Sequence, residues 1–214
     1  MERKKNLVQW LALLGVAGTI FYFLHVILGK ANYPGYNPLA QAVSDLTAAT
    51  APSREIASAY STVYAFFTVA ACTLLCVFYQ GKVNNVFRLG IYLFAVMEWT
   101  SAVGYTLFPL SASGYAGSFQ DIMHMVVTAI VVLLSIASMI LITVGCFQSR
   151  VHKLFGIFTI AVLGMMALGS IATGIVPVGY FGVAERLSVY SVVIYSAALS
   201  LFTYRYPVQY PKAI

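Results

Sequence analysis

Residues 122–146 read IMHMVVTAIVVLLSIASMILITVGC, a run without a single Asp, Glu, Lys or Arg. A helix of about 20 apolar residues crosses the hydrocarbon core of a bilayer, so this run predicts a transmembrane helix. Five further runs are also apolar all round, without the alternation of a membrane β-barrel. They cover residues 7–28, 56–79, 87–110, 155–176 and 187–203. The sequence therefore predicts an all-α fold in which residues 1–214 form one bundle of six transmembrane helices.

The composition agrees with a membrane protein and disagrees with a water-soluble one. Hydrophobic residues make up 61% of the 214 residues, charged residues make up 8%, and the mean hydropathy is +0.87. A soluble domain carries roughly 25% charged residues, so a water-soluble globule is excluded. The net charge of +6 does not indicate nucleic-acid binding, because the basic residues are scattered between apolar runs.

The basic residues predict the orientation of the chain in the membrane. If the N-terminus is cytoplasmic, most of the 12 Lys and Arg residues fall on the cytoplasmic side. These are Arg3, Lys4, Lys5, Lys82, Arg88, Arg150, Lys153, Arg205 and Lys212. The positive-inside rule then predicts a multi-pass protein of the cell membrane with both termini in the cytoplasm.

The first apolar run could belong to a cleaved signal peptide, because basic residues precede it. It is longer than the roughly 7–15 residues of such a peptide, and no small-residue cleavage pattern follows it. We interpret it as a retained first span.

The first predicted outer loop, residues 29–55, is the longest. It begins with a turn-rich segment, and residues 39–49 then carry apolar side chains at helical spacing. This pattern predicts a short helix that lies along the membrane interface.

Glu98 is the one acidic residue in the middle of a predicted span. It lies about 15 Å beyond Arg88 along a helix. A charge at this depth costs about 2.5–3.5 kcal/mol or more, so the carboxyl group should face the bundle interior in its neutral form. Two interpretations stay open. Glu98 either carries protons or contacts a polar substrate, or it only hydrogen-bonds to a neighbouring Ser or Tyr.

Asp121 and His124 share one helix face at the predicted outer start of the fourth span. A carboxylate beside an imidazole can fix its tautomer and raise its basicity, which suits a general base. Alternatively, Asp121 pairs with Ser118 in a capping box, and His124 only hydrogen-bonds within the bundle. His25 lies at a similar depth in the first span.

Further polar residues lie on the same predicted side, in the first loop and at the start of the sixth span. We expect one outward-facing pocket, in which the catalytic candidates are His124, Asp121, Asp45 and Glu185. The substrate-binding candidates are Arg186, Ser44, His25 and Glu98. Arg186 suits an anionic lipid headgroup, and a salt bridge to Glu185 would also explain it.

No cofactor motif stands out. A zinc site needs about three ligands, which His25, His124 and one carboxylate could supply, and two facing histidines could bind haem. Neither arrangement has a spacing signature, so a site without a cofactor is also open. Cys72, Cys76 and Cys146 all lie in predicted spans, so no structural disulfide is expected outside.

Several short motifs resemble a known family. Residues 33–38 (YPGYNP), 43–46 (VSDL) and 51–52 (AP) resemble the first outer loop of bacterial and archaeal six-span proteins classified as domain of unknown function 998. The motifs Phe108-Pro109, Asp121-x-x-His124 and Glu185-Arg186 are similar to later positions of that family. Its members often carry a longer acidic and His-rich stretch where this chain has only Asp121 and His124. The resemblance implies a prokaryotic six-span fold with outward polar positions and no established reaction.

Three functional hypotheses follow from these residues. The first is a membrane enzyme or lipid-handling protein that binds or acts on a lipid or another membrane-embedded substrate at the outer pocket. The second is a proton-coupled small-molecule transporter that uses Glu98. The third is a non-catalytic assembly or sensory subunit that binds a protein partner. Membrane lipids are the expected partners, and a homo-oligomer is compatible with all three hypotheses.

Overall fold

The computed structural model describes residues 5–149 and 152–206, and in these ranges every regular element is a helix. Six helical segments there are long and apolar enough to cross a membrane. The first consists of α1 and α2, which meet at Leu13. The elements are α1 (Leu7–Ala12), α2 (Leu14–Ala31), η1 (Ser44–Thr47), α3 (Arg54–Phe78), α4 (Asn85–Leu107), α5 (Phe119–Ser149), α6 (Lys153–Ala172), η2 (Val178–Tyr180) and α7 (Phe181–Arg205).

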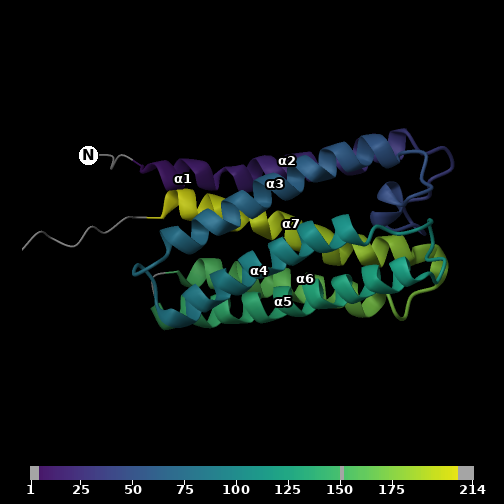
Figure 1. The fold of residues 1–214 in the computed structure, drawn as a ribbon. Helices are drawn as coiled ribbons and strands as arrows, with labels where there is room; N and C mark the ends of the chain where they lie inside the picture. Colours follow the sequence, from purple (N-terminus) through teal and green to yellow (C-terminus); the bar gives the residue numbers. More distant parts are fainter. Residues whose placement is uncertain (1–4, 150–151, 207–214) are drawn as a thin grey trace, which may run out of the picture.

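The long helices run side by side, and each packs against its neighbours in the chain (Figure 1). Helix α7 returns to pack against α2, which closes the bundle into a ring. The connection between α3 and α4 lies at the end where the described chain begins and stops. The opposite end carries residues 32–53, 108–118 and 173–180, and we call it the loop end. The prediction that this end faces outward stays a prediction.

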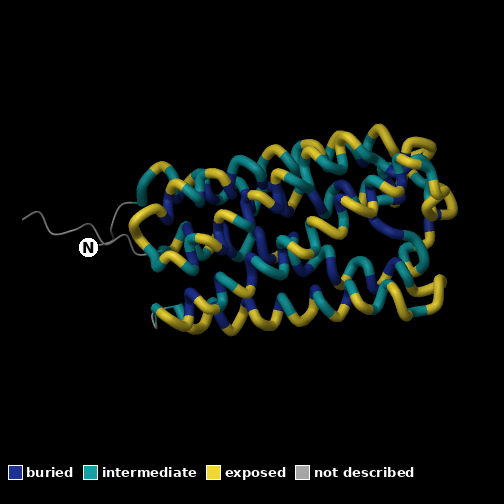
Figure 2. The backbone as a smooth tube through the Cα atoms, turned by 60° about the horizontal axis from the view of Figure 1, so that its bottom comes forward, coloured by how far each residue is buried: buried dark blue, intermediate teal, exposed yellow. Residues whose placement is uncertain are grey.

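Burial follows the layout of a membrane bundle. Buried residues line the inner faces of the helices, and exposed residues cover the outside (Figure 2). The exposed residues include large apolar side chains such as Phe66, Leu133 and Leu168, each about two-thirds exposed. Water would disfavour such a surface, whereas lipid tails suit it. The chain is a multi-pass membrane protein.

Glycines allow α4 and α5 to pack closely. A Cβ atom on Gly145 would lie 2.5 Å from the Cβ of Phe87, and one on Gly90 would lie 2.8 Å from the backbone nitrogen of Ile142. Real side chains do not approach this closely, so these positions require glycine.

The structure corrects one sequence-based prediction about the loops. Residues 39–49 do not form a continuous helix, and only the 3-10 turn Ser44–Thr47 is helical. Polar side chains accept hydrogen bonds from backbone amides in this segment. Asn37 accepts a hydrogen bond from the Leu39 amide at 3.1 Å, and Asp45 accepts one from the Ala42 amide at 2.9 Å. Such local bonds compete with helix formation.

The ends of the spans differ from the predicted ends by a few residues. For example, α3 begins at Arg54 rather than Ile56, and α5 extends over Phe119–Ser149. Helices α3 and α5 begin before the apolar runs because polar residues at these ends can reach the headgroup region, whereas α4 and α6 end before the runs do, at Leu107 and Ala172.

Candidate functional site at the loop end

Arg186, in the first turns of α7, holds the first loop against the bundle. Its Nη1 donates to the carbonyl oxygens of Pro38 and Gln41, each at 2.7 Å, and its Nη2 donates to the Tyr36 hydroxyl. Gly182 makes room for this contact, because a Cβ atom there would lie 2.3 Å from the Gln41 carbonyl oxygen. The guanidinium group therefore binds the chain's own backbone rather than pairing with Glu185.

Tyr36 also holds the first loop, although the sequence does not mark it as a functional residue. Its hydroxyl donates to the Ala42 carbonyl oxygen at 2.6 Å. Burial raises the pKa of Tyr36 to about 12, although the nearby Arg186 acts in the opposite direction. The phenol therefore stays neutral and keeps the proton that it donates.

Asp45 and Glu185 also bind backbone amides of the loops. Asp45 accepts from the amides of Ala42 at 2.9 Å and Gly114 at 3.0 Å, so it joins the first loop to the second. The carboxylate of Glu185 accepts from the Val43 amide, with both oxygens at 3.3 Å. The neighbouring Ser44 contributes its carbonyl oxygen, which accepts from the Thr47 hydroxyl in the 3-10 turn.

Asp121 caps α5 and fastens the second loop. It accepts from the Ser111 amide at 2.7 Å, the Ser111 hydroxyl at 2.8 Å and the Ser118 amide at 3.1 Å. The Ser118 hydroxyl in turn accepts from the Asp121 amide at 3.2 Å. This reciprocal pair is a capping box, so that prediction is confirmed. Asp121 is fully buried.

His124 is oriented by a backbone carbonyl group. Its Nδ1 lies 2.8 Å from the carbonyl oxygen of Phe108, where α4 has ended. A carbonyl oxygen only accepts, so Nδ1 carries a proton. In the part of the chain that the structure describes, no hydrogen bond joins His124 to Asp121 and none reaches Nε2. Tyr105 packs on the ring, with 4.8 Å between the ring centroids.

His25 and Glu98 lie deeper in the bundle, away from the loop contacts. Both are buried, with 4% and 2% of their surface exposed. Neither ring nitrogen of His25 has a hydrogen-bond partner among the described residues, and its closest aromatic neighbour in α2 is Tyr22. No group of three or more His, Cys, Asp and Glu side chains in these residues could hold a metal ion. Binding of zinc by His25, His124 and a carboxylate, or of haem by the two histidines, stays a prediction.

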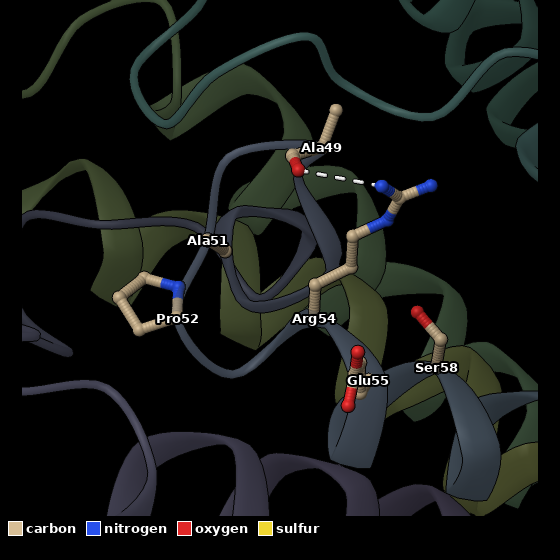
Figure 3. A pocket seen from close by; sticks show the side chains of 6 residues that line it. All are labelled: Ala49, Ala51, Pro52, Arg54, Glu55 and Ser58. Atoms are coloured by element: carbon tan, nitrogen blue, oxygen red, sulfur yellow. Dashed lines mark hydrogen bonds between the residues drawn. The ribbon is translucent and has the colours of Figure 1, made fainter.

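A hollow that the sequence did not predict lies beside the loops. It has a volume of about 500 Å³ and is lined by Ala49, Ala51, Pro52, Arg54, Glu55 and Ser58 (Figure 3). Arg54 and Glu55 are both exposed. The one hydrogen bond of the Arg54 side chain within the described residues runs to the Ala49 carbonyl oxygen and is long, at 3.4 Å. The sequence feature that could have indicated this site is the pair of adjacent charged residues, Arg54 and Glu55, at the start of a predicted span.

The fold and the loop contacts together define the class of this protein. It is a six-span helical membrane protein whose polar loops are fastened to the bundle by charged side chains. The family model "Protein of unknown function (DUF998)" matches residues 16–201, so the chain belongs to this family. No curated protein and no solved structure matches the chain.

Proposed function

We propose that this protein binds a membrane lipid by its phosphate-containing headgroup in the hollow at the start of α3. The observation that carries the proposal is the exposed Arg54 guanidinium beside a polar hollow at headgroup depth. Arginine binds phosphate through two parallel hydrogen bonds, and Arg54 has most of its donors free for them.

The depth of the hollow follows from the length of α3. Its 25 residues span about 37 Å, whereas the hydrocarbon core is about 30 Å thick. The first turn of α3, which contains Arg54 and Glu55, therefore lies at the level of the headgroups. Glu55 and Ser58 give the hollow an anionic and a neutral polar group beside the cation.

Three hydrogen bonds hold the segment of residues 46–53 that leads into the hollow. The Ala49 amide donates to the Leu110 carbonyl oxygen at 2.8 Å, and the Ser53 hydroxyl donates to the Leu46 carbonyl oxygen at 2.8 Å. The Ala51 amide donates to the Ala48 carbonyl oxygen at 3.0 Å. A preorganised site of this kind loses little entropy when a ligand binds.

Native mass spectrometry tests the proposal. The protein is released from nanodiscs that contain phosphatidylglycerol and phosphatidylethanolamine, and the lipid that remains bound is quantified. We expect Arg54→Gln to weaken lipid binding roughly 10- to 100-fold, since a hydrogen bond to a charged group contributes about 1.5–3 kcal/mol. Arg88→Gln, which removes the same charge at the opposite end, is the matched control. Equal lipid retention by the two variants would overturn the proposal.

His124 supports a second candidate function, acid–base catalysis on a lipid. The observation that favours it is the Phe108 carbonyl, which holds the proton on Nδ1 and leaves Nε2 as a base. Protein in phospholipid vesicles should then form a lipid product that mass spectrometry detects and that His124→Gln abolishes. A product that still forms with His124→Gln, or no product with the natural chain, would exclude this role.

A further inference from the structure

The hollow beside α3 is lined by a cation, an anion and a hydroxyl group, which belong to Arg54, Glu55 and Ser58. Along the helix, Ser58 follows Arg54 by four positions and Glu55 by three. Side chains at these spacings are neighbours on a helix surface, with about 5–6 Å between their Cβ atoms. The three polar groups therefore share one patch at the start of α3, and Figure 3 shows them at the hollow.

The protein itself leaves these three groups available. Figure 3 shows the Arg54 guanidinium and the Glu55 carboxylate pointing in different directions, so they do not pair with each other. Arg54 makes one long bond to a loop carbonyl oxygen, at 3.4 Å, and no hydrogen bond within the described residues reaches the Glu55 carboxylate or the Ser58 hydroxyl. The neighbouring hydroxyls of Ser61 and Thr62 behave differently, because they donate to a carbonyl oxygen of α3 at 3.1 and 2.8 Å.

The opposite charges of the hollow favour a ligand that carries both signs. A phosphate group suits Arg54, but the Glu55 carboxylate would repel it if the ligand had no cation. An ammonium group next to the phosphate would remove this repulsion. Its N–H groups would donate to the Glu55 carboxylate and to the Ser58 hydroxyl oxygen. An ethanolamine headgroup has both charges, with only two carbon atoms between the phosphate and the ammonium group.

We infer, on the basis of the lipid binding proposed above, that the ligand of this hollow is a phosphatidylethanolamine. Its phosphate binds Arg54, and its ammonium group lies between Glu55 and Ser58. Phosphatidylglycerol lacks the cation, so its phosphate would meet the carboxylate without compensation. Phosphatidylcholine keeps the cation but has no N–H donor, because its nitrogen is fully methylated. Both lipids should therefore bind more weakly than phosphatidylethanolamine.

Native mass spectrometry with competing lipids tests this preference. The full-length protein is released from nanodiscs that contain the three phospholipids in equal amounts and with identical acyl chains, so that only the headgroups differ. We expect the natural chain to retain roughly 2- to 5-fold more phosphatidylethanolamine than either competitor, the range for an exposed ion pair. Glu55→Gln should abolish the preference, and Glu55→Asp, which keeps the charge, should retain most of it.

The hydroxyl group of Ser58 has a matched control on the same helix. Ser58→Ala should reduce the preference for phosphatidylethanolamine over phosphatidylcholine, because it removes an acceptor for the ammonium group. Ser61→Ala should leave the preference unchanged, because the Ser61 hydroxyl already donates to the backbone of α3. Equal effects of the two substitutions would contradict the placement of the ammonium group beside Ser58.

Arg54→Gln in the same lipid mixture separates the headgroup preference from lipid binding itself. Equal retention of the three lipids by the natural chain, with less total lipid on Arg54→Gln, would overturn the preference and leave phosphate binding intact. A preference that persists in Glu55→Gln would also overturn it, because the carboxylate would not be its source. If Arg54→Gln retains as much lipid as the control Arg88→Gln, the phosphate site and the preference both fail.

Discussion

The loop end and the bundle interior use polar side chains in opposite ways. At the loop end, Asp45, Asp121 and Arg186 each make at least two hydrogen bonds to backbone groups of the loops. In the interior, Glu98 and His25 are as buried as Asp45 and Asp121 but have atoms without partners among the described residues. The burial of a polar side chain therefore does not reveal its role.

The difference separates folding from binding. A side chain whose hydrogen bonds all go to its own chain stabilises a conformation and has little capacity left for a ligand. A buried side chain with free donors or acceptors carries an energetic cost that a ligand can remove. Four of the residues predicted to form an outer pocket, Asp45, Asp121, Glu185 and Arg186, bind groups of their own chain. His124 is intermediate, because its Nδ1 has a partner and its Nε2 has none among the described residues.

Arg186→Met should have the largest effect. It removes four hydrogen bonds and leaves three carbonyl oxygens and the Tyr36 hydroxyl without their donor. We expect a loss of about 3 kcal/mol or more in the free energy of unfolding and rapid proteolysis within residues 32–53. Thermal unfolding and limited chymotrypsin digestion measure both effects. Arg186→Lys keeps the charge but not the planar donor set, so it should rescue only part of the loss. Unchanged digestion of Arg186→Met would show that the loop does not depend on this anchor.

Asp121→Ala should have a smaller effect, confined to the second loop and the start of α5. Loss of a helix cap costs about 1–2 kcal/mol, and Asp121 also fastens Ser111. Asp121→Asn keeps one acceptor oxygen and should lie between Asp121→Ala and the natural chain in its Tm. Glu55→Ala provides the matched control, an acid in the first turn of α3, and should cost about 0.5 kcal/mol. Equal Tm values for Asp121→Ala and Glu55→Ala would contradict a structural role for Asp121.

His25→Phe should have the smallest effect and the opposite sign. The imidazole lies against Tyr22 with both nitrogens unpaired within the described residues, so an apolar ring of similar size removes an unsatisfied group. We expect a gain of up to about 1 kcal/mol, seen as a higher Tm. A lower Tm would show that His25 has a hydrogen-bond partner in the purified protein. His25 would then stabilise the fold, as the charged residues of the loop end do.

The sequence alone was sufficient to predict the fold. Apolar runs and their length determine six spans, because lipid leaves backbone groups no alternative to helices. The capping box of Ser118 and Asp121 was also predictable, because both partners are three residues apart in the chain.

The site was less predictable, because its contacts depend on loop conformations. Nothing in the local sequence indicates that Arg186 would bind the carbonyl oxygens of Pro38 and Gln41, about 145 positions away. The same holds for the hydrogen bond between His124 and Phe108, where Asp121 was the expected partner. The unpaired state of Glu98 depends on which side chains α3 and α7 bring near it, and only the folded bundle determines that.

Charged side chains stabilise the folded loops by accepting hydrogen bonds from their backbone amides. Hydrogen–deuterium exchange of the purified protein tests it directly, in peptides that cover residues 40–46 and 109–118. If these hydrogen bonds hold the loops, the amides of Val43, Gly114 and Ser111 exchange as slowly as amides in the helices, and Asp121→Ala accelerates Ser111 without accelerating Val43. Exchange of all three at the rate of an unstructured peptide would contradict it.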